Sequence, residues 1–290
     1  MPDSATLWDL LTADATRWRL ALFAAVLLTL ALLEALRPGP NPPLRRGRRW
    51  PAHLGLALID TAVARLLLPA GAAGAALWAQ AQGFGLFNGL EDMPGTALPL
   101  WLEWTLGLLL LDLAIYWQHR WLHAVPWLWP LHRTHHTDTT LDATSALRFH
   151  PLEIVLSLLY KMALAVALGL EPALVLAFEA LLSSFALITH ADLALPPRLD
   201  RALRRVFVTP AMHRIHHSTH MDEQHRNYGF HLSVWDRLFR SYAAEARDQP
   251  QAFGVAGTSV ARATGLWALL REPFAGTRPP TQDAPTDDAH

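Results

Sequence analysis

The sequence predicts an all-α integral membrane protein, with about four to five membrane helices under a cytosolic, histidine-rich helical cap. Three observations predict this fold class. Of the 290 residues, 52% are hydrophobic and only 17% are charged, which is too apolar for a soluble domain of this length. The apolar residues form runs close to the roughly 20 residues that a helix needs to cross a bilayer. The chain also has 15 histidines, and most of them lie in tight clusters beside these runs.

The first two apolar segments cover residues 18–36 and 54–78. We interpret the first as a membrane helix, with a cleaved signal peptide as the rival interpretation, because arginines flank it. Its apolar run is long, however, and no small-residue cleavage site follows it. Residues 37–50, between the two segments, carry five arginines among four prolines. The bias of positive charge toward the cytoplasm therefore predicts a cytoplasmic basic loop there.

Three more apolar segments follow, over residues 98–117, 151–170 and 172–189. The loop before them, residues 80–96, has no lysine or arginine and is expected on the outer side of the membrane. The last two segments are separated only by a short connection that contains Gly169 and Glu171. Such a short connection predicts an antiparallel helical hairpin.

These segments predict three parts of the chain. Residues 1–97 are expected to form N-terminal membrane helices and the basic loop, and residues 98–245 a catalytic domain of membrane helices plus cap. Residues 246–290 form a C-terminal extension whose end, from Ala275 onward, is rich in proline, threonine and aspartate. That composition is typical of a disordered tail.

Composition also excludes several kinds of site and partner. The chain has no cysteine, so disulfides, iron–sulfur clusters and thiolate metal sites are excluded, and imidazole and carboxylate are the strong metal ligands that remain. The formal net charge is −1. A near-neutral chain lacks the basic field that nucleic-acid binding requires.

The histidines recur at spacings that suit metal binding. His119 and His123 are four residues apart, which places them on one face of a helix. Two further boxes, His132/His135/His136 and His213/His216/His217, each have histidines at positions i, i+3 and i+4. We expect positions i and i+3 of a box to serve one metal, while position i+4 turns toward a second metal.

The number of histidines favours two metals. These boxes supply eight histidines, whereas a single zinc takes about three or four protein ligands. Imidazole binds iron, zinc, copper and nickel alike. Iron is the favoured metal, because a redox-silent pair would not need so many neutral ligands in a membrane setting.

The three boxes resemble the histidine motifs of the fatty-acid hydroxylase and sterol desaturase superfamily, over roughly residues 98–242. Five further phrases strengthen the resemblance: Phe149-His150-Pro151-Leu152-Glu153, Thr189-His190-Ala191-Asp192, Thr209-Pro210-Ala211-Met212-His213, Asn227-Tyr228-Gly229 and Trp235-Asp236-Arg237-Leu238-Phe239. The resemblance implies membrane helices under a cytosolic cap that holds two irons, with His190 as a ninth ligand. Two departures are Asp192, near a common asparagine of the family, and Arg240, where glycine is frequent.

Four residues are candidates for the shell of groups around the ligands: Asp112, His150, Asp192 and Asp236. Asp112 lies seven residues before His119, so on one helix its carboxylate can accept the second ring N–H of a ligand histidine. An ion pair with Arg65 is the alternative. His150 and His220 are also considered as further metal ligands, with a turn position before Pro151 as the alternative for His150. His53 is expected to face solvent.

The resemblance implies O2-dependent, di-iron C–H oxidation of a membrane lipid, a fatty acid or a sterol-like molecule. Hydroxylation is favoured over desaturation. The chain has no dinucleotide-binding glycine motif, cysteine cluster or haem-attachment motif. Electrons are therefore expected from an external ferredoxin or cytochrome with its reductase. A single lysine among many arginines suggests a bacterial source, so we expect the bacterial inner membrane, with the active site facing the cytoplasm.

Two rival functions come from other classes. A zinc-dependent membrane hydrolase would use a metal-bound water and a glutamate base, but the His-Glu-x-x-His pattern is absent. A metal transporter would have histidines and acids within its membrane spans, whereas these histidines lie at the ends of the spans. Both rivals remain as alternatives to lipid oxidation.

Overall fold

The computed structural model describes residues 14–37, 39, 46–91, 93–95, 97–249, 251–258 and 264–275. Within these residues the chain is helical, and its only β structure is two isolated bridges. Five segments are long and apolar enough to cross a membrane. The predicted all-α membrane fold is therefore confirmed. Part of the basic loop, residues 38 and 40–45, and residues 276–290 of the predicted tail lie outside the described residues.

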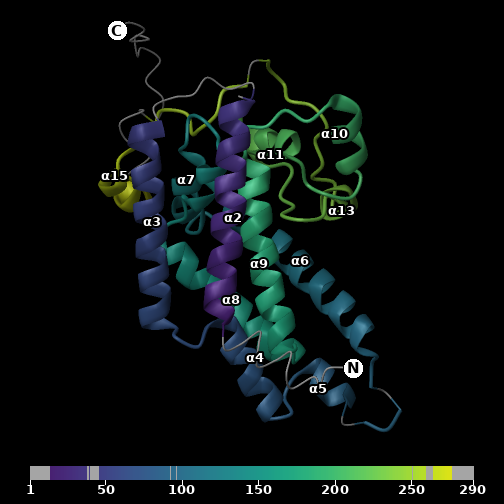
Figure 1. Cartoon of the computed structure of the whole chain (residues 1–290). Helices are drawn as coiled ribbons and strands as arrows, with labels where there is room; N and C mark the ends of the chain where they lie inside the picture. Colours follow the sequence, from purple (N-terminus) through teal and green to yellow (C-terminus); the bar gives the residue numbers. More distant parts are fainter. Residues whose placement is uncertain are drawn as a thin grey trace, which may run out of the picture.

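The membrane part is built from long helices that stand side by side (Figure 1). In chain order they are α2 (Ala15–Leu36), α3 (Arg46–Leu67), α4 (Gly71–Ala81), α5 (Leu86–Glu91), α6 (Leu100–Ala124), α8 (Pro151–Leu168) and α9 (Pro172–His190). Helices α3, α4 and α5 together make up one of the five candidate spans. Figure 1 shows α6 leaning away from α9 toward the end of the bundle that carries α5.

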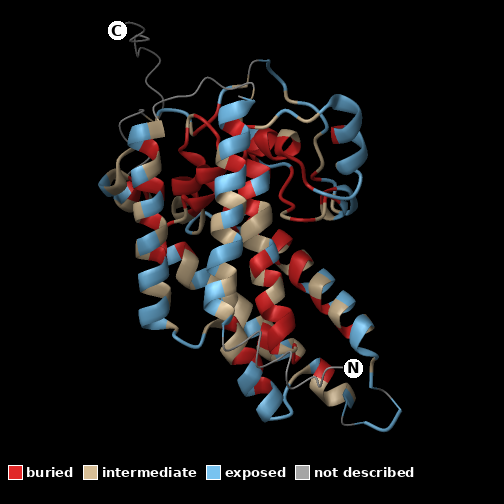
Figure 2. Ribbon diagram, viewed as in Figure 1, coloured by how far each residue is buried: buried red, intermediate tan, exposed pale blue. Residues whose placement is uncertain are grey.

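Short helices form a cap at the other end of the bundle. They are α7 (Trp129–His136), η1 (Ala143–Leu147), α10 (Pro197–Leu203), α11 (Pro210–His216), α12 (Met221–Gln224), α13 (Val234–Leu238), α15 (Leu266–Arg271) and η2 (Glu272–Phe274). Figure 2 shows buried residues concentrated inside this cap, whereas the outer sides of α2 and α3 are largely exposed. The exposed outer sides are rich in leucine, as expected for surfaces that face lipid.

Two element boundaries differ from the predicted ones. The second apolar segment was predicted as one span, but it breaks between α3 and α4, where Pro69 provides no backbone N–H and Gly71 has a φ of 60°. The third segment was predicted to end at residue 117, but α6 continues to Ala124. The extension carries His119 and His123 on the same helix that crosses the membrane.

The predicted hairpin of α8 and α9 is present. Gly169 caps α8 with a φ of 65°, and Pro172 begins α9. An ion pair joins the two helices, because the Lys161 ammonium lies 2.7 Å from a carboxylate oxygen of Glu179. Arg19 of α2 lies 3.0 Å from the other oxygen of Glu179. These contacts neutralise a carboxylate within the membrane part and tie α2 to the hairpin.

The first turn of α3 is also an anchor for the cap. Arg49 belongs to the predicted basic loop, yet it is only 2% exposed. Its guanidinium donates to Asp138 at 2.6 Å and to Asp142 at 2.8 Å. On α2, Glu34 accepts the backbone N–H groups of Ala143 and Asp192, at 2.8 and 2.9 Å. The N-terminal helices therefore hold the segment that follows the second histidine box.

We predict that Arg49→Met lowers the free energy of unfolding by about 3 kcal/mol, because it removes the cation that pairs with buried Asp142 and one of the two that lie beside buried Asp138. Arg48→Met is the matched control, since Arg48 is exposed on the same turn, and its effect should stay within about 0.5 kcal/mol. Thermal unfolding in detergent measures both. Equal melting temperatures for the two variants would contradict a stabilising role for Arg49.

Arg240 occupies a backbone conformation that favours glycine. Its φ is 59°, in the left-handed region that costs a residue with a Cβ about 1–2 kcal/mol. We therefore predict that Arg240→Gly stabilises the protein by about 1 kcal/mol, which raises the melting temperature by about 2 °C. Arg240→Ala removes the same charge but keeps the Cβ, so it should give no such gain. A gain shared by both variants would assign the effect to charge.

Candidate metal centre

The nine histidines predicted as ligands come together in two buried groups inside the cap. The first group has five members and the second has four. In each group the ring nitrogens that can bind a metal all lie within 4.8 Å of one another. The groups are His119, His123, His132, His136 and His216, and His135, His190, His213 and His217. Histidines of α6, α7, α9 and α11 therefore converge at the cap end of the membrane helices.

The two triple boxes divide their histidines between the groups differently from the prediction. Positions i and i+4 share a group, as His132 and His136 do, while position i+3, His135, faces the other group. In the third box, positions i and i+4, His213 and His217, share the second group, while position i+3, His216, joins the first. Helical geometry explains why positions i and i+4, rather than i and i+3, share a group. Position i+4 lies about 40° from position i around the helix, whereas position i+3 lies about 60° away on the other side.

Hydrogen bonds to ring Nδ1 atoms orient the first group. His119 Nδ1 donates to the carbonyl of Tyr228, and His216 Nδ1 donates to the carbonyl of Arg226, both at 2.8 Å. A carbonyl only accepts, so these Nδ1 atoms carry the proton, and each neutral ring has its lone pair on Nε2. The two Nε2 atoms nevertheless lie only 3.0 Å apart. Two lone pairs at this distance repel each other, so the donor set fits a cation placed among them.

His132 extends the same arrangement. Its Nδ1 lies 2.8 Å from a carboxylate oxygen of Glu153, and its Nε2 lies 3.1 Å from that of His119. A ligand histidine that gives its second ring N–H to a carboxylate is a common feature of protein metal sites. Glu153 thus supports a candidate ligand, although the sequence alone did not single it out from the motif around His150 and Pro151. The feature that could have identified it is its position two residues after Pro151, in the first turn of α8.

The second group has the same character. His190 Nδ1 donates to the Ala186 carbonyl at 2.7 Å, so its Nε2 is unprotonated in the neutral ring. That Nε2 lies 3.0 Å from the Nε2 atom of His135 and 3.1 Å from that of His213. His217 Nε2 in turn lies 3.1 Å from His213 Nε2. The four rings therefore present nitrogen atoms to one point.

Five histidines of the second and third boxes are also held in the neutral form that metal binding requires. Burial, reinforced by the neighbouring imidazoles, lowers the pKa of the histidines of the second and third boxes for which a shift is resolved. That of His216 falls to about 3. The others in this set are His135, His136, His213 and His217. Neutral, buried and convergent imidazoles fit a metal better than they fit an ordinary protein core.

Asp236 supports the first group indirectly, through the backbone of Tyr228. Its carboxylate is fully buried and accepts the backbone N–H groups of Tyr228 and Gly229, at 2.8 and 2.9 Å. It also accepts the Ser241 hydroxyl at 2.7 Å. Because the Tyr228 carbonyl accepts from His119, Asp236 fixes the backbone that orients this ring. Burial raises the pKa of Asp236 to about 6.

Asp112 lies against a different histidine from the predicted one. Its carboxylate accepts from His231 Nδ1 at 2.6 Å and from the Trp235 indole N–H at 2.8 Å. His231 belongs to neither metal-binding group. The alternative partner, Arg65, donates instead to the Thr16 hydroxyl at 3.3 Å. The reason is tertiary, since the chain before α13 packs against the side of α6 that carries Asp112.

The other candidates lie around the groups. His150 caps α8 by accepting the Leu152 N–H at 3.2 Å, and its Nε2 lies 3.1 Å from the Leu270 carbonyl. His220 pairs with Asp248 at 2.7 Å. Neither is a member of the two groups.

Two further residues lie near the boxes. Asp192 lies 3.7 Å from Arg214, a residue of the third box. His53 was expected in solvent but is fully buried, between Thr144 at 2.9 Å and Arg148 at 3.0 Å. Its burial follows from the packing of α3 against η1 and the segment that follows η1.

Comparison with known proteins gives relatives that act on lipids. Over 176 residues the chain is 29% identical to an ornithine lipid hydroxylase of Rhizobium tropici, which covers 61% of this chain and 51% of that protein. It is 32% identical over 167 residues to human alkylglycerol monooxygenase, with 57% of this chain and 34% of that protein covered. A Delta(7)-sterol 5(6)-desaturase of Gibberella zeae is 38% identical over 78 residues, or 26% of this chain and 21% of that protein.

The chain therefore spans about half the length, or less, of these curated relatives. No solved structure matches it. The fatty acid hydroxylase family model matches residues 104–241, which contain all nine clustered histidines. This match covers slightly less than half of the chain, and together with the lipid-modifying relatives it supports the superfamily of fatty-acid hydroxylases and sterol desaturases for these residues.

Proposed function

We propose that the protein is a di-iron enzyme that uses O2 to oxidise a C–H bond of a membrane lipid. The observation that carries this proposal is the pair of histidine groups, in which neutral rings direct their nitrogen lone pairs toward two points inside the cap. Five and four imidazoles suit two metals, and redox chemistry suits relatives named as hydroxylases, monooxygenases and a desaturase. Bound there, two irons would supply O2 reduction and the oxidation of an unactivated C–H bond.

The protein's own residues hold and shield such a centre. Tyr228, Arg226 and Glu153 bond the Nδ1 atoms of three of the five rings of the first group, which fixes the orientations of these three before a metal arrives. The ligand rings are all buried, so bulk water is kept away from the reacting atoms. The groups lie at the cap ends of α6 and α9, so in this proposal the lipid would reach them from the bilayer.

We favour hydroxylation as the outcome. The matches to the ornithine lipid hydroxylase and to human alkylglycerol monooxygenase cover 61% and 57% of this chain, whereas the match to the sterol desaturase covers only 26% of it. The substrate class in this proposal is a lipid with a long alkyl or acyl chain. Electrons come from an external ferredoxin or cytochrome with its reductase. We place the enzyme in a bacterial inner membrane with its cap in the cytoplasm, where such carriers are found.

Metal analysis tests the di-iron site directly. We expect about two irons per chain in protein purified anaerobically in detergent, with Mössbauer spectra typical of a coupled pair. Because His135 and His216 belong to different groups, His135→Ala with His216→Ala should lower the iron content at both points. His220→Ala is the matched control, since His220 lies outside the groups and pairs with Asp248. It should retain the iron.

The same measurement separates the rival functions. Stable zinc after anaerobic iron reconstitution, or one metal or less per chain, would overturn the oxygenase and favour a zinc hydrolase. Metal flux across proteoliposomes, without lipid oxidation, would favour a transporter.

Glu153→Gln tests the carboxylate that holds His132. The amide keeps the size of the side chain but loses the charge that strengthens the hydrogen bond to Nδ1. We predict that metal affinity at the first group falls about 10-fold to 100-fold, as found for such supporting carboxylates. Glu171→Gln is the control, because Glu171 bonds Trp104 at the far end of α9. Chelator competition measures the metal affinity of both variants. Equal affinities for the two variants would contradict a role of Glu153 in holding His132.

A further inference from the structure

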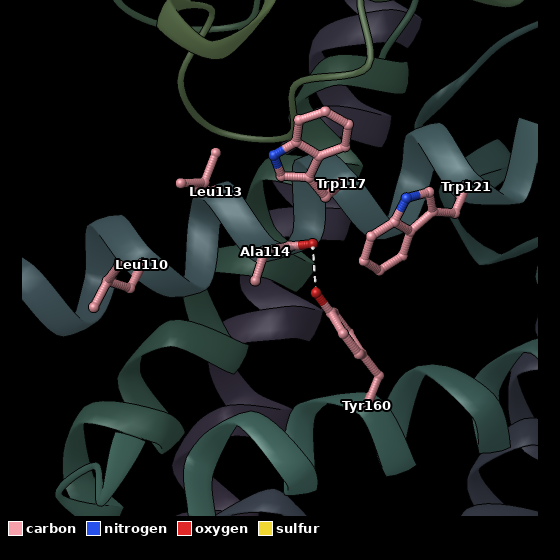
Figure 3. Close-up of a pocket in the computed structure, with 6 residues that line it drawn as sticks. All are labelled: Leu110, Leu113, Ala114, Trp117, Trp121 and Tyr160. Atoms are coloured by element: carbon pink, nitrogen blue, oxygen red, sulfur yellow. Dashed lines mark hydrogen bonds between the residues drawn. The ribbon is translucent and has the colours of Figure 1, made fainter. Parts of the chain in front are cut away.

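A groove runs along the outer side of α6, within the membrane part. It has a volume of about 450 Å³ and is open to the outside. Tyr160 rises from α8 toward α6, and its hydroxyl donates to the Ala114 carbonyl at 3.3 Å (Figure 3). The groove is lined by Leu110, Leu113, Ala114, Trp117, Trp121 and Tyr160. All six belong to helices that are long and apolar enough to cross a membrane.

This groove is separate from the metal centre. Trp117 and Trp121 each precede a ligand histidine, His119 or His123, by two residues. Two residues correspond to about 200° around a helix, so the tryptophans and the histidines lie on opposite faces of α6. The groove therefore does not serve as the path of a substrate to the histidine groups.

The lining of the groove suits an alkyl chain. Its side chains are aliphatic or aromatic except for the Tyr160 hydroxyl, which is satisfied by Ala114. One edge is closed by α8, where the Ser157 hydroxyl donates to Gln118 at 3.3 Å and the rings of Trp121 and Tyr160 lie 6.0 Å apart. The volume lies within the range of roughly 300–1,000 Å³ that is usual for small-molecule sites.

A cationic side chain stands at the cap end of the groove. The Arg120 guanidinium lies 5.3 Å from the centre of the Trp117 ring and donates to the Tyr116 hydroxyl at 3.3 Å. Arg120 is half-buried, and no acidic residue of the described part of the chain forms an ion pair with it. Phe239, whose ring centre lies 4.9 Å from that of Trp117, is followed by the exposed Arg240. Positive charge therefore borders the groove where α6 enters the cap.

We propose that this groove binds an anionic phospholipid of the membrane. One acyl chain lies along α6 from Leu110 to Trp121, and the headgroup phosphate pairs with Arg120. A planar guanidinium matches phosphate oxygens with two parallel hydrogen bonds. Tryptophan rings are typical of the depth at which headgroups begin. A lipid with net negative charge is favoured because the half-buried Arg120 has no carboxylate partner within the described chain.

Native mass spectrometry of the whole protein in detergent tests the site, with phosphatidylglycerol and phosphatidylcholine of equal chain length as the probes. We expect tighter binding of phosphatidylglycerol, and a loss of about tenfold in its affinity for Arg120→Gln. Ala114→Phe or Leu110→Trp should abolish binding by filling the groove. Arg205→Gln is the control, because Arg205 is exposed beside α10, and it should bind as the wild type does. Thermal unfolding in lipid-free detergent identifies the variants that fold.

Three results would overturn the proposal. Equal affinity for the two lipids would remove the role of charge, and phosphatidylglycerol binding that survives either groove-filling variant would place the lipid elsewhere. A dimer that dissociates in those variants would make the groove an interface between copies of the chain. Because these measurements need neither metal nor turnover, their outcome does not depend on whether the protein is the proposed oxygenase.

Discussion

The burial of nine imidazoles at two points is the constraint on which the rest of the structure depends. A buried ring N–H without a hydrogen-bond partner costs about 1–3 kcal/mol, and the Nδ1 atoms of five of these rings have no such partner. Where Nδ1 donates to the carbonyls of Tyr228, Arg226 and Ala186, the Nε2 lone pairs are left to converge. Without a cation those lone pairs repel each other. The donor set of the cap thus fits a cation that the protein itself does not provide, and the proposed metal binding would therefore be linked to cap stability.

Parts of the chain outside residues 104–241 complete this cap. Arg49 of α3 and Glu34 of α2 hold the segment that follows the second histidine box. From the C-terminal side, Arg133 within that box donates to the Glu272 carbonyl at 2.6 Å, and its Nε lies 3.1 Å from a carboxylate oxygen of Glu272. Both ends of the chain therefore stabilise the box from outside the family segment. In a membrane protein this arrangement ties the cap rigidly to its helices.

Helix α6 joins two environments. One face places His119 and His123 in the first histidine group, and the face about half a turn away carries Trp117 and Trp121 in the outer groove. The helix has no glycine or proline between these positions and no break over its 25 residues. A rigid helix that packs on both of these faces holds His119 and His123 in place without help from mobile loops.

The sequence by itself determined the membrane helices and the eight histidines of the three boxes, because hydrophobic runs and i, i+3, i+4 spacings are local properties of the chain. His190, the ninth, was implied only by the resemblance to a known family. Tertiary structure decided that His132 and His136 share a group while His135 joins the other. It also paired Asp112 with His231 and brought Glu153 to His132. These partners come from different helices, and their meeting depends on how the helices rotate and tilt against one another. Spacing within one helix carries no information about that rotation.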